Sequence, residues 1–205
     1  MKAFIIYPKR RDWEGVNRHL FPILNGECLV ARHDRLFPER GFETVAISPT
    51  RDIANVEVLY QEATEIELAA LSIEFWDDYN ILLSGSCWPS VAAADSMVKC
   101  ALEGTPRVHG RCQSAKYGEG QCVFGFSWGS AYNEEMSDAF RVASQHHKAG
   151  DIQSSSLINL VGVLLRGKVG TWPGFPTQYS TWNEIDDETT LLTHYSYYLQ
   201  WLENK

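Results

Sequence analysis

Two short stretches of the sequence place polar side chains where a buried strand is expected to end. The apolar run Ala3–Tyr7 leads into the basic cluster Lys9–Arg11. The apolar run Ile81–Leu83 leads into the turn-like segment Ser84–Ser86. Ligands of open α/β sheets bind outside the carboxyl ends of the strands, and guanidinium groups bind phosphate through paired hydrogen bonds. The first stretch therefore predicts a phosphate-binding turn, with an ordinary solvated basic turn as the alternative.

The second stretch carries Ser86 at a place where an acidic residue would indicate a metal site. Carboxylate oxygens are ligands that Mg²⁺ prefers in proteins, and a neutral hydroxyl is a poor replacement for one. Ser86 is therefore either part of a ligand site without a metal carboxylate or a turn residue before the helix that Pro89 opens.

Other candidate residues lie further along the chain. Arg111 precedes a Gly-rich stretch, Tyr117–Trp128, and could contact a phosphate or a sugar, although a hairpin or edge strand is the simpler explanation of this stretch. A later group of aromatic rings could stack on a sugar or a base, or could pack as a loop over the sheet. That group comprises Trp172, Phe175, Tyr179 and Trp182.

Two clusters resemble metal ligands only at first sight. His146 and His147 are adjacent on an expected helix, where neighbouring side chains point in different directions, so we predict a solvated helix end. The pair Asp77–Asp78 precedes its strand instead of following it, which indicates a polar turn.

The apolar spacing alternates between strand and helix along the first half of the chain. Thr64 and Glu67 form a capping box at the start of a helix predicted over Thr64–Asp77. Such alternation predicts a parallel sheet with helices on both faces. The expected fold class is therefore α/β, a three-layer α/β/α Rossmann-like fold with a mostly parallel central sheet. Strands are expected at Ala3–Tyr7, Thr44–Ile47, Val56–Tyr60, Ile81–Leu83, Thr105–Arg111 and Gln121–Phe126, and helices within 26–41, after Pro89 with Val91, Ala94, Val98 and Ala101 on one apolar face, across most of 129–165 and at the end of the chain.

Length, charge and cysteine content limit the class of protein. The 205 residues suit one sizeable core, so residues 1–205 are expected to form a single domain. A net charge of −8 argues against a broad surface for nucleic acid or anionic membrane, while a local basic pocket remains compatible with it. No apolar run approaches the ~20 residues of a membrane span. Five cysteines without a CxxC pair indicate free thiols, no zinc site and a cytoplasmic location.

Three segments, taken together and in this order, resemble a known group of enzymes. They are MKAFIIYPKRR, then NRHLFPILNGECLVARHDRLFPERGFETVAI, and then ILLSGSCWPS followed much later by WNEIDDETTLLTHYSYYL. This pattern is similar to the nucleotidyltransferases that join a nucleotide to a phosphorylated sugar or alcohol, within the nucleotide-diphospho-sugar transferase superfamily. The resemblance covers most of the chain and implies a fold of the glycosyltransferase-A type.

The resemblance also implies roles for particular residues. In the family, a Gly-rich loop after the first strand wraps the triphosphate, because glycine lets backbone N–H groups approach phosphates closely. This chain has YPKRRDWEG there, with only Gly15, so cationic side chains would supply the contacts. Arg18, ahead of HLFPI, stands where the family has a lysine, with a surface salt bridge as the alternative. The implied nucleotide-binding residues are Tyr7, Pro8, Lys9, Arg10, Arg11, Gly85 and Ser86, with Arg10, Arg18 and Asp186 in catalytic roles and Arg111 and Trp182 on the acceptor side.

The family holds its magnesium ion between two aspartates, one in a Gly-Asp pair after the strand and one in a C-terminal EID segment. Asp186 matches the second position, whereas Ser86 stands at the first, directly after Gly85. The alternative role for Asp186 is a helix N-cap, although Asp187 could serve as that cap. The resemblance therefore implies a Mg²⁺ site of which only half is present.

Three functions remain open at this point. The first is a nucleotidyltransferase, in which a phosphate attacks the α-phosphorus of a nucleoside triphosphate and releases pyrophosphate. The second is a glycosyltransferase that uses a nucleotide-diphosphate sugar and a small-molecule or modified nucleic-acid acceptor; it suits the short phosphate loop but lacks an Asp-x-Asp motif after the strand. The third is a non-catalytic nucleotide-binding relative. The expected partners are a nucleotide or nucleotide sugar and a small-molecule acceptor, without support for nucleic acid and without a membrane.

Overall fold

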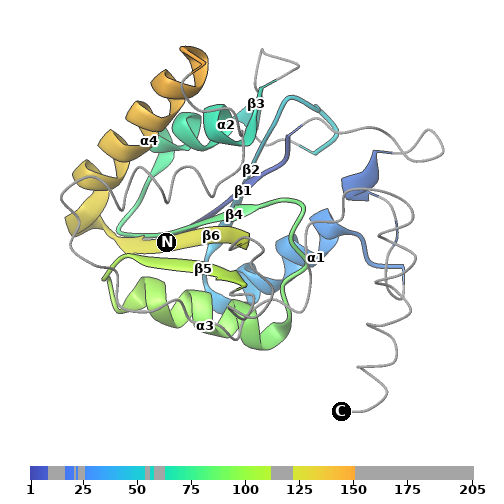
Figure 1. Cartoon of the computed structure of the whole chain (residues 1–205). Helices are drawn as coiled ribbons and strands as arrows, with labels where there is room; N and C mark the ends of the chain where they lie inside the picture. The colour runs from blue at the N-terminus through green and yellow to red at the C-terminus, as the bar shows by residue number, and fades with distance from the viewer. Residues whose placement is uncertain are drawn as a thin grey trace, which may run out of the picture.

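The computed structural model describes residues 1–8, 17–20, 22, 26–53, 56–57, 63–111 and 122–150. Within them, six strands form one sheet in the order β3-β2-β1-β4-β6-β5 (Figure 1). The strands are β1 (Lys2–Ile6), β2 (Glu43–Ser48), β3 (Val56–Glu57), β4 (Tyr79–Ser84), β5 (Arg107–Arg111) and β6 (Cys122–Gly129).

Helices cover both faces of this sheet. Alternate side chains of each strand point to opposite faces, and β1 divides accordingly: Phe4 and Ile6 pack with α2 (Glu65–Leu71) and α4 (Asn133–Lys148). Ala3 and Ile5 pack on the other face with α1 (Leu29–Leu36) and α3 (Val91–Leu102). Figure 1 shows the resulting layers, with α2 and α4 above the sheet and α1 and α3 below it. The predicted three-layer α/β/α architecture is confirmed.

The centre of the sheet is parallel and buried on both sides. β1 pairs in parallel with β2 on one side and with β4 on the other. Its residues from Ala3 onward are buried, as in a strand that helices cover on both faces. Ile6, the last residue of β1, lies opposite Ile47 of β2 and Ser84 of β4. The chain thus leaves β1 towards β2 and later returns to β4 on the opposite side, which makes the β1–β4 boundary the topological switch point of the sheet.

The other half of the sheet differs from the prediction. β6 is antiparallel to β4, and β5 is antiparallel to β6. β5 and β6 are consecutive antiparallel partners, so the expected hairpin is present, but β6 is an interior strand and β5 is the edge. β5 still runs in the same direction as β4, so it also ends at the carboxyl edge of the parallel strands. The sheet remains mostly parallel because β1, β2, β3 and β4 run together.

Helix boundaries agree with the local sequence signals. The predicted capping box is present, since the Thr64 hydroxyl accepts from the Glu67 N–H and the Glu67 carboxylate accepts from the Thr64 N–H. The helix ends earlier than expected, because the chain tightens after Leu71 into the 3₁₀ turn η3 (Ser72–Phe75). Pro38 ends α1, as predicted, and begins the short 3₁₀ turn η2 (Pro38–Arg40).

One predicted helix face needs a correction. Ser90 caps α3 by accepting from the Ala93 N–H, so the helix begins after Pro89 and not at it. Val91 is 49% exposed and does not belong to the apolar face. It lies in the first turn, directly after the cap. The face that packs on the sheet has Ala93, Ala94, Met97 and Ala101 as its buried residues, and the predicted Val98 packs against it half-buried.

Several expectations fall on residues that are not described. The strand predicted over Val56–Tyr60 is described only as β3, and the region 151–205 lies wholly outside the described residues. The 3₁₀ turn η5 (Ser130–Tyr132) and α4 confirm the helical prediction as far as residue 148. In the part of the chain that the structure describes, no helix is long and apolar enough to cross a membrane.

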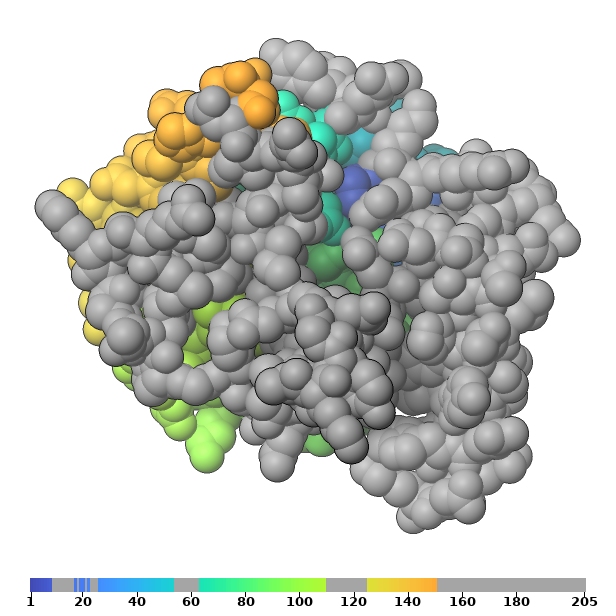
Figure 2. Space-filling view, viewed as in Figure 1, coloured from blue at the N-terminus to red at the C-terminus, as the bar shows by residue number. Residues whose placement is uncertain are grey.

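In the space-filling view, yellow and orange residues of α4 line one side and green residues of α3 the opposite side (Figure 2).

Candidate functional site

Four of the predicted site residues meet at the switch point. Tyr7 and Pro8 follow β1, Gly85 and Ser86 follow β4, and all four are buried. The Gly85 N–H donates to the Ile6 carbonyl at 2.7 Å, which joins the two strand ends directly. The carboxyl ends of β1 and β4 are therefore hydrogen-bonded to each other at the place where ligands of α/β sheets bind.

The remaining predicted residues are only partly described. Arg18 begins the 3₁₀ turn η1 (Arg18–Leu20), and Arg111 is the last residue of β5, but their side chains are not described. The other predicted residues lie outside the described part of the chain: Lys9, Arg10, Arg11, Trp182 and Asp186. Their roles in phosphate, acceptor and metal binding remain predictions.

A chain of two buried hydrogen bonds links Tyr7 to the turn after β4. The Tyr7 hydroxyl lies 2.7 Å from Nδ1 of His33, and Nε2 of His33 lies 2.9 Å from the Cys87 carbonyl oxygen. A carbonyl oxygen only accepts, so Nε2 carries the proton and Nδ1 accepts from the Tyr7 hydroxyl. His33 is thus fixed in one tautomer, and α1 is connected to both strand ends.

Burial keeps both members of this chain neutral. Desolvation lowers the pKa of His33 to about 3, although the bond to Cys87 opposes that shift. Burial also raises the pKa of Tyr7 well above its usual value, and the charges of Asp34 and Cys28 add to the effect. The Tyr7 hydroxyl therefore remains a donor, and the His33 imidazole remains an acceptor at Nδ1.

Glycine is required at position 85 because the Tyr7 ring occupies the adjoining space. A Cβ at this position would lie 2.1 Å from Cδ1 of Tyr7 and 2.8 Å from the Ile6 carbonyl oxygen. Real Cβ atoms do not approach other heavy atoms so closely, and neither neighbour is the flexible end of a long side chain. Gly85 is therefore needed for close approach of two chain segments.

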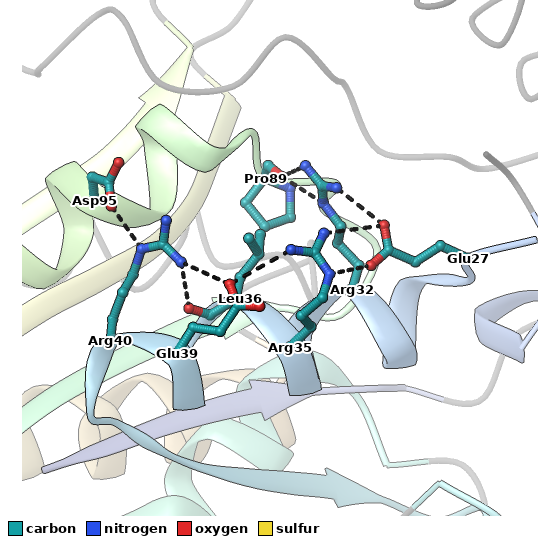
Figure 3. A network of polar contacts seen from close by, with 8 residues as sticks. All are labelled: Glu27, Arg32, Arg35, Leu36, Glu39, Arg40, Pro89 and Asp95. Carbon is teal, nitrogen blue, oxygen red and sulfur yellow. Dashed lines mark hydrogen bonds and ion pairs between the residues drawn. The ribbon is translucent and has the colours of Figure 1, made fainter. Parts of the chain in front are cut away.

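Arg32 provides a second connection between α1 and the same turn. Its Nε and Nη2 donate to the Pro89 carbonyl at 3.1 and 3.0 Å, and Nη1 donates to Glu27 at 3.0 Å (Figure 3). The guanidinium also lies 5.0 Å from the centre of the buried Trp88 ring. Arg32 and His33, neighbours in α1, thus bind two carbonyls of one turn.

Arginine residues of α1 and of the following turn η2 extend this network. Burial alone would raise the pKa of Glu27, but hydrogen bonds from Arg35 and Arg32 outweigh that effect and lower it. Arg40 donates to Asp95 of α3 at 2.7 Å and to the Leu36 carbonyl at 2.7 Å. Figure 3 shows these side chains on one side of α1, between the helix and the start of α3. The network fixes α1 against α3 more than it offers a ligand site.

Three successive backbone N–H groups of the turn after β4 are already used. The Gly85 N–H donates to Ile6, the Cys87 N–H donates to the Ser84 carbonyl at 3.1 Å, and the Ser86 N–H lies 3.4 Å from the Ser84 hydroxyl. A phosphate cradle would need such donors to face the ligand. This turn shapes the site but does not supply a nest of amides for phosphate.

The turn also fails to supply the expected metal carboxylate. The Ser86 side chain is neutral and fully buried, at 0% exposure. Among the described residues, no group of three or more His, Cys, Asp or Glu side chains could hold a metal ion. The β4 side therefore does not fit the two-aspartate arrangement that the resemblance implies.

The structure adds Glu65 to this edge of the sheet. Glu65 is the first residue of α2, is 4% exposed, and accepts a 2.6 Å hydrogen bond from the hydroxyl of Ser84, the last residue of β4. The sequence alone did not predict this pair, because the cap formed by Thr64 and Glu67 already accounts for the local pattern. The sequence does carry one signal for this pair. Glu65 is a carboxylate directly after the helix cap, in the first turn of the helix that precedes β4.

The sequence matches no protein-family profile, and no curated protein sequence matches it. Solved structures do match its fold. The 2-C-methyl-D-erythritol 4-phosphate cytidylyltransferase of Francisella tularensis has a TM-score of 0.60 at 9% identity, over 98% of this chain and 99% of that chain. The corresponding enzyme of Thermus thermophilus has a TM-score of 0.57 at 13% identity, over 97% and 99%.

A third solved structure belongs to a protein of Bacillus anthracis assigned as a glucose-1-phosphate thymidylyltransferase. Its TM-score is 0.64 at 11% identity, over 96% of this chain and 94% of that chain. At such identities the likeness shows the fold alone. The fold is the one that these solved nucleotidyltransferase structures have, which agrees with the fold that the sequence resemblance implies.

Replacing Gly85 tests the contact between the two strand ends. Gly85→Ala should lower the free energy of unfolding by about 3 kcal/mol, since the added methyl group overlaps the Tyr7 ring. Gly150→Ala is the comparison, because Gly150 has a φ of +81° but no atom within 4 Å of the added Cβ. That variant should lose only about 1 kcal/mol. Urea unfolding measures both, and equal losses would contradict the Tyr7 contact.

The buried histidines predict a specific loss of stability in mild acid. The pKa values of His33 and His109 are both lowered to about 3, chiefly by burial. Below the usual histidine pKa of about 6.5, the unfolded chain therefore binds protons that the folded chain does not, and stability falls as the pH falls. At pH 5 the loss is about 2 kcal/mol for each histidine.

His33→Gln separates the two contributions. The glutamine carboxamide can accept from Tyr7 and donate to Cys87 without titrating. Urea unfolding between pH 7 and pH 5 should show about 2 kcal/mol less pH-dependent loss than in the wild type. An unchanged pH dependence would show that His33 is not buried in its neutral form.

Proposed function

We propose that this protein is a nucleotidyltransferase that transfers a nucleotidyl group from a nucleoside triphosphate to a phosphorylated sugar or alcohol. The observation that carries the proposal is the joined end of β1 and β4 at the switch point of a fold shared with cytidylyltransferases along nearly the whole chain. Their names identify a sugar-alcohol phosphate, 2-C-methyl-D-erythritol 4-phosphate, as what those enzymes act on.

The proposed reaction needs positioning and charge neutralisation more than covalent chemistry from side chains. An acceptor phosphate oxygen attacks the α-phosphorus, and the bond to pyrophosphate breaks. Because the amides after β4 are used internally, the phosphates would depend on cations that follow β1. Arg10 and Arg11 would hold the triphosphate with Lys9, and Arg18 would stabilise the charge on the leaving pyrophosphate.

Magnesium would be held by a carboxylate from the C-terminal part of the sequence. Mg²⁺ sites commonly combine one or two carboxylates with phosphates of the substrate. Asp186 is the carboxylate that the sequence resemblance provides, and Ser86 provides none. A bound ion would neutralise phosphate charge. Arg111, at the end of β5, and Trp182 would contact the acceptor.

The neutral, buried Ser86 favours a second candidate function. A glycosyltransferase with a nucleotide-diphosphate sugar handles one phosphate less and needs less charge neutralisation. The acceptor would be a small molecule, since the net charge of −8 gives no support to nucleic acid. A non-catalytic nucleotide-binding protein would keep the same strand junction without either reaction.

A ligand screen by thermal shift separates these functions. We expect one of ATP, CTP, GTP and UTP, with Mg²⁺, to raise the melting temperature by about 5 °C or more at about 100 times its Kd. The double variant Arg10→Gln/Arg11→Gln should lose most of that shift. Lys99→Gln is the matched control, because Lys99 is an exposed cation in the last turn of α3.

Other results would contradict the proposal in different ways. Stabilisation by UDP-glucose or GDP-mannose alone would favour glycosyl transfer, and stabilisation by no compound would favour a protein without this chemistry. An equal shift in the arginine double variant would remove these arginines from the phosphate site.

Replacement of Ser86 tests the position of the proposed metal. Ser86→Asp buries a carboxylate at a fully buried position, so stability without Mg²⁺ should fall by about 3 kcal/mol. If Asp186 lies opposite this turn, Mg²⁺ with nucleotide should restore part of the loss. Ser86→Asn has a similar size without the charge and should not respond to Mg²⁺. Identical responses of the two variants would place Asp186 away from the β4 turn.

A further inference from the structure

The turn between β4 and α3 is held at regular intervals by groups from outside it. The Gly85 N–H is bound by Ile6, the Cys87 carbonyl by His33 and the Pro89 carbonyl by Arg32. No residue between 85 and 89 is more than one position away from such an anchor. The turn is therefore specified by β1 and α1 and not by its own sequence alone.

The bonds through Tyr7 and His33 act on the part of the turn that faces the switch point. Tyr7 contacts Gly85 through its ring and reaches His33 through its hydroxyl. His33 in turn holds Cys87, so the two contacts fix the residues on both sides of Ser86. Arg32 binds further along, at Pro89, where the helix α3 is about to begin.

We propose that Tyr7 and His33 are positioning residues that hold the Gly85–Ser86 turn in the shape that receives the nucleotide. The proposal rests on the proposed function for its ligand, but the geometry of the turn can be measured without one. It assigns Tyr7 a role through His33 in addition to its predicted place beside the nucleotide.

The hydrogen-bond pattern makes this role specific to one donor–acceptor arrangement. The imidazole must accept on the Tyr7 side and donate on the Cys87 side, because the Cys87 carbonyl cannot donate. A side chain that can both accept from Tyr7 and donate to Cys87 should preserve the conformation of the turn. An apolar side chain of similar size should fill the same space but leave the turn without these hydrogen bonds. Substitutions can thus separate the stability of the protein from the position of the Gly85–Ser86 turn.

The experiment compares three variants. His33→Leu removes both hydrogen bonds, His33→Gln can replace both, and His109→Leu removes a different buried bond, the 2.8 Å contact between His109 and Ser127 in β5 and β6. The probes are ATP, CTP, GTP and UTP, each with Mg²⁺, and Kd is measured by isothermal titration. We expect His33→Leu to weaken binding about tenfold, which corresponds to 1.4 kcal/mol. His33→Gln and His109→Leu should bind like the wild type, although His109→Leu should unfold at a lower temperature.

A second measurement separates failure of this inference from failure of the proposed function. Amide NMR signals of Gly85 and Ser86, recorded without nucleotide, should shift or broaden in His33→Leu and remain in place in His33→Gln and His109→Leu. If the wild type binds none of the probes, the proposed function fails and the NMR result alone decides the positioning role. Unchanged Gly85 and Ser86 signals in His33→Leu would overturn that role, as would unchanged nucleotide affinity at reduced stability.

Tyr7→Phe provides a milder test if His33→Leu does not fold. It removes only the hydroxyl and keeps the ring that packs on Gly85. Nucleotide affinity should fall by less than in His33→Leu, because the bond between His33 and Cys87 remains. The same two NMR signals report the result, and signals identical to the wild type together with wild-type affinity would overturn the role of the hydroxyl.

Discussion

The arrangement of the candidate site depends on one constraint, the joining of the β1 and β4 ends by a neutral imidazole. His33 accepts from Tyr7, donates to Cys87 and is fully buried. Each buried polar group that it binds would otherwise lose a partner, and leaving buried donors and acceptors unpaired is more costly than an average hydrogen bond is stabilising. The ring therefore restricts the relative position of two strands and a helix. Gly85 is part of the same constraint, because only glycine lets the turn approach Tyr7.

The helix α1 owes its place to the same residues. An eight-residue helix has little stability of its own in water, and here Leu29 and Leu36 bury its apolar side while Arg32 and His33 bind the turn after β4. The exposed side carries the ion pair between Arg35 and Glu27 that Figure 3 shows. Such partly exposed pairs contribute little individually. The buried bonds, more than the surface charges, thus determine where α1 lies.

The sequence predicted the elements of this fold better than their partners. β1 and β4 were predictable from their apolar runs, and α2 from the reciprocal cap of Thr64 and Glu67. The antiparallel insertion of β6 was not, because local periodicity does not encode which strands pair. The imidazole bonds join residues 26 and 54 positions apart, so neither was visible as a motif. The two apolar runs did predict that Tyr7 and Ser86 follow the ends of two strands, and the structure shows these strands to be neighbours.

The two sides of the switch point differ in charge, and this difference limits how a phosphate can be bound there. On the β4 side, Ser86 is neutral, the turn amides are used within the protein, and the nearby carboxylate, Glu65, is bound to Ser84. An anion placed against that side alone would lose hydration without gaining a cation. The segment after β1 is where the sequence concentrates positive charge, in Lys9–Arg11. A nucleotide at this junction would therefore place its phosphates near the segment that follows β1. The uncharged turn after β4 would help to position the nucleotide but would not neutralise the charge of its phosphates.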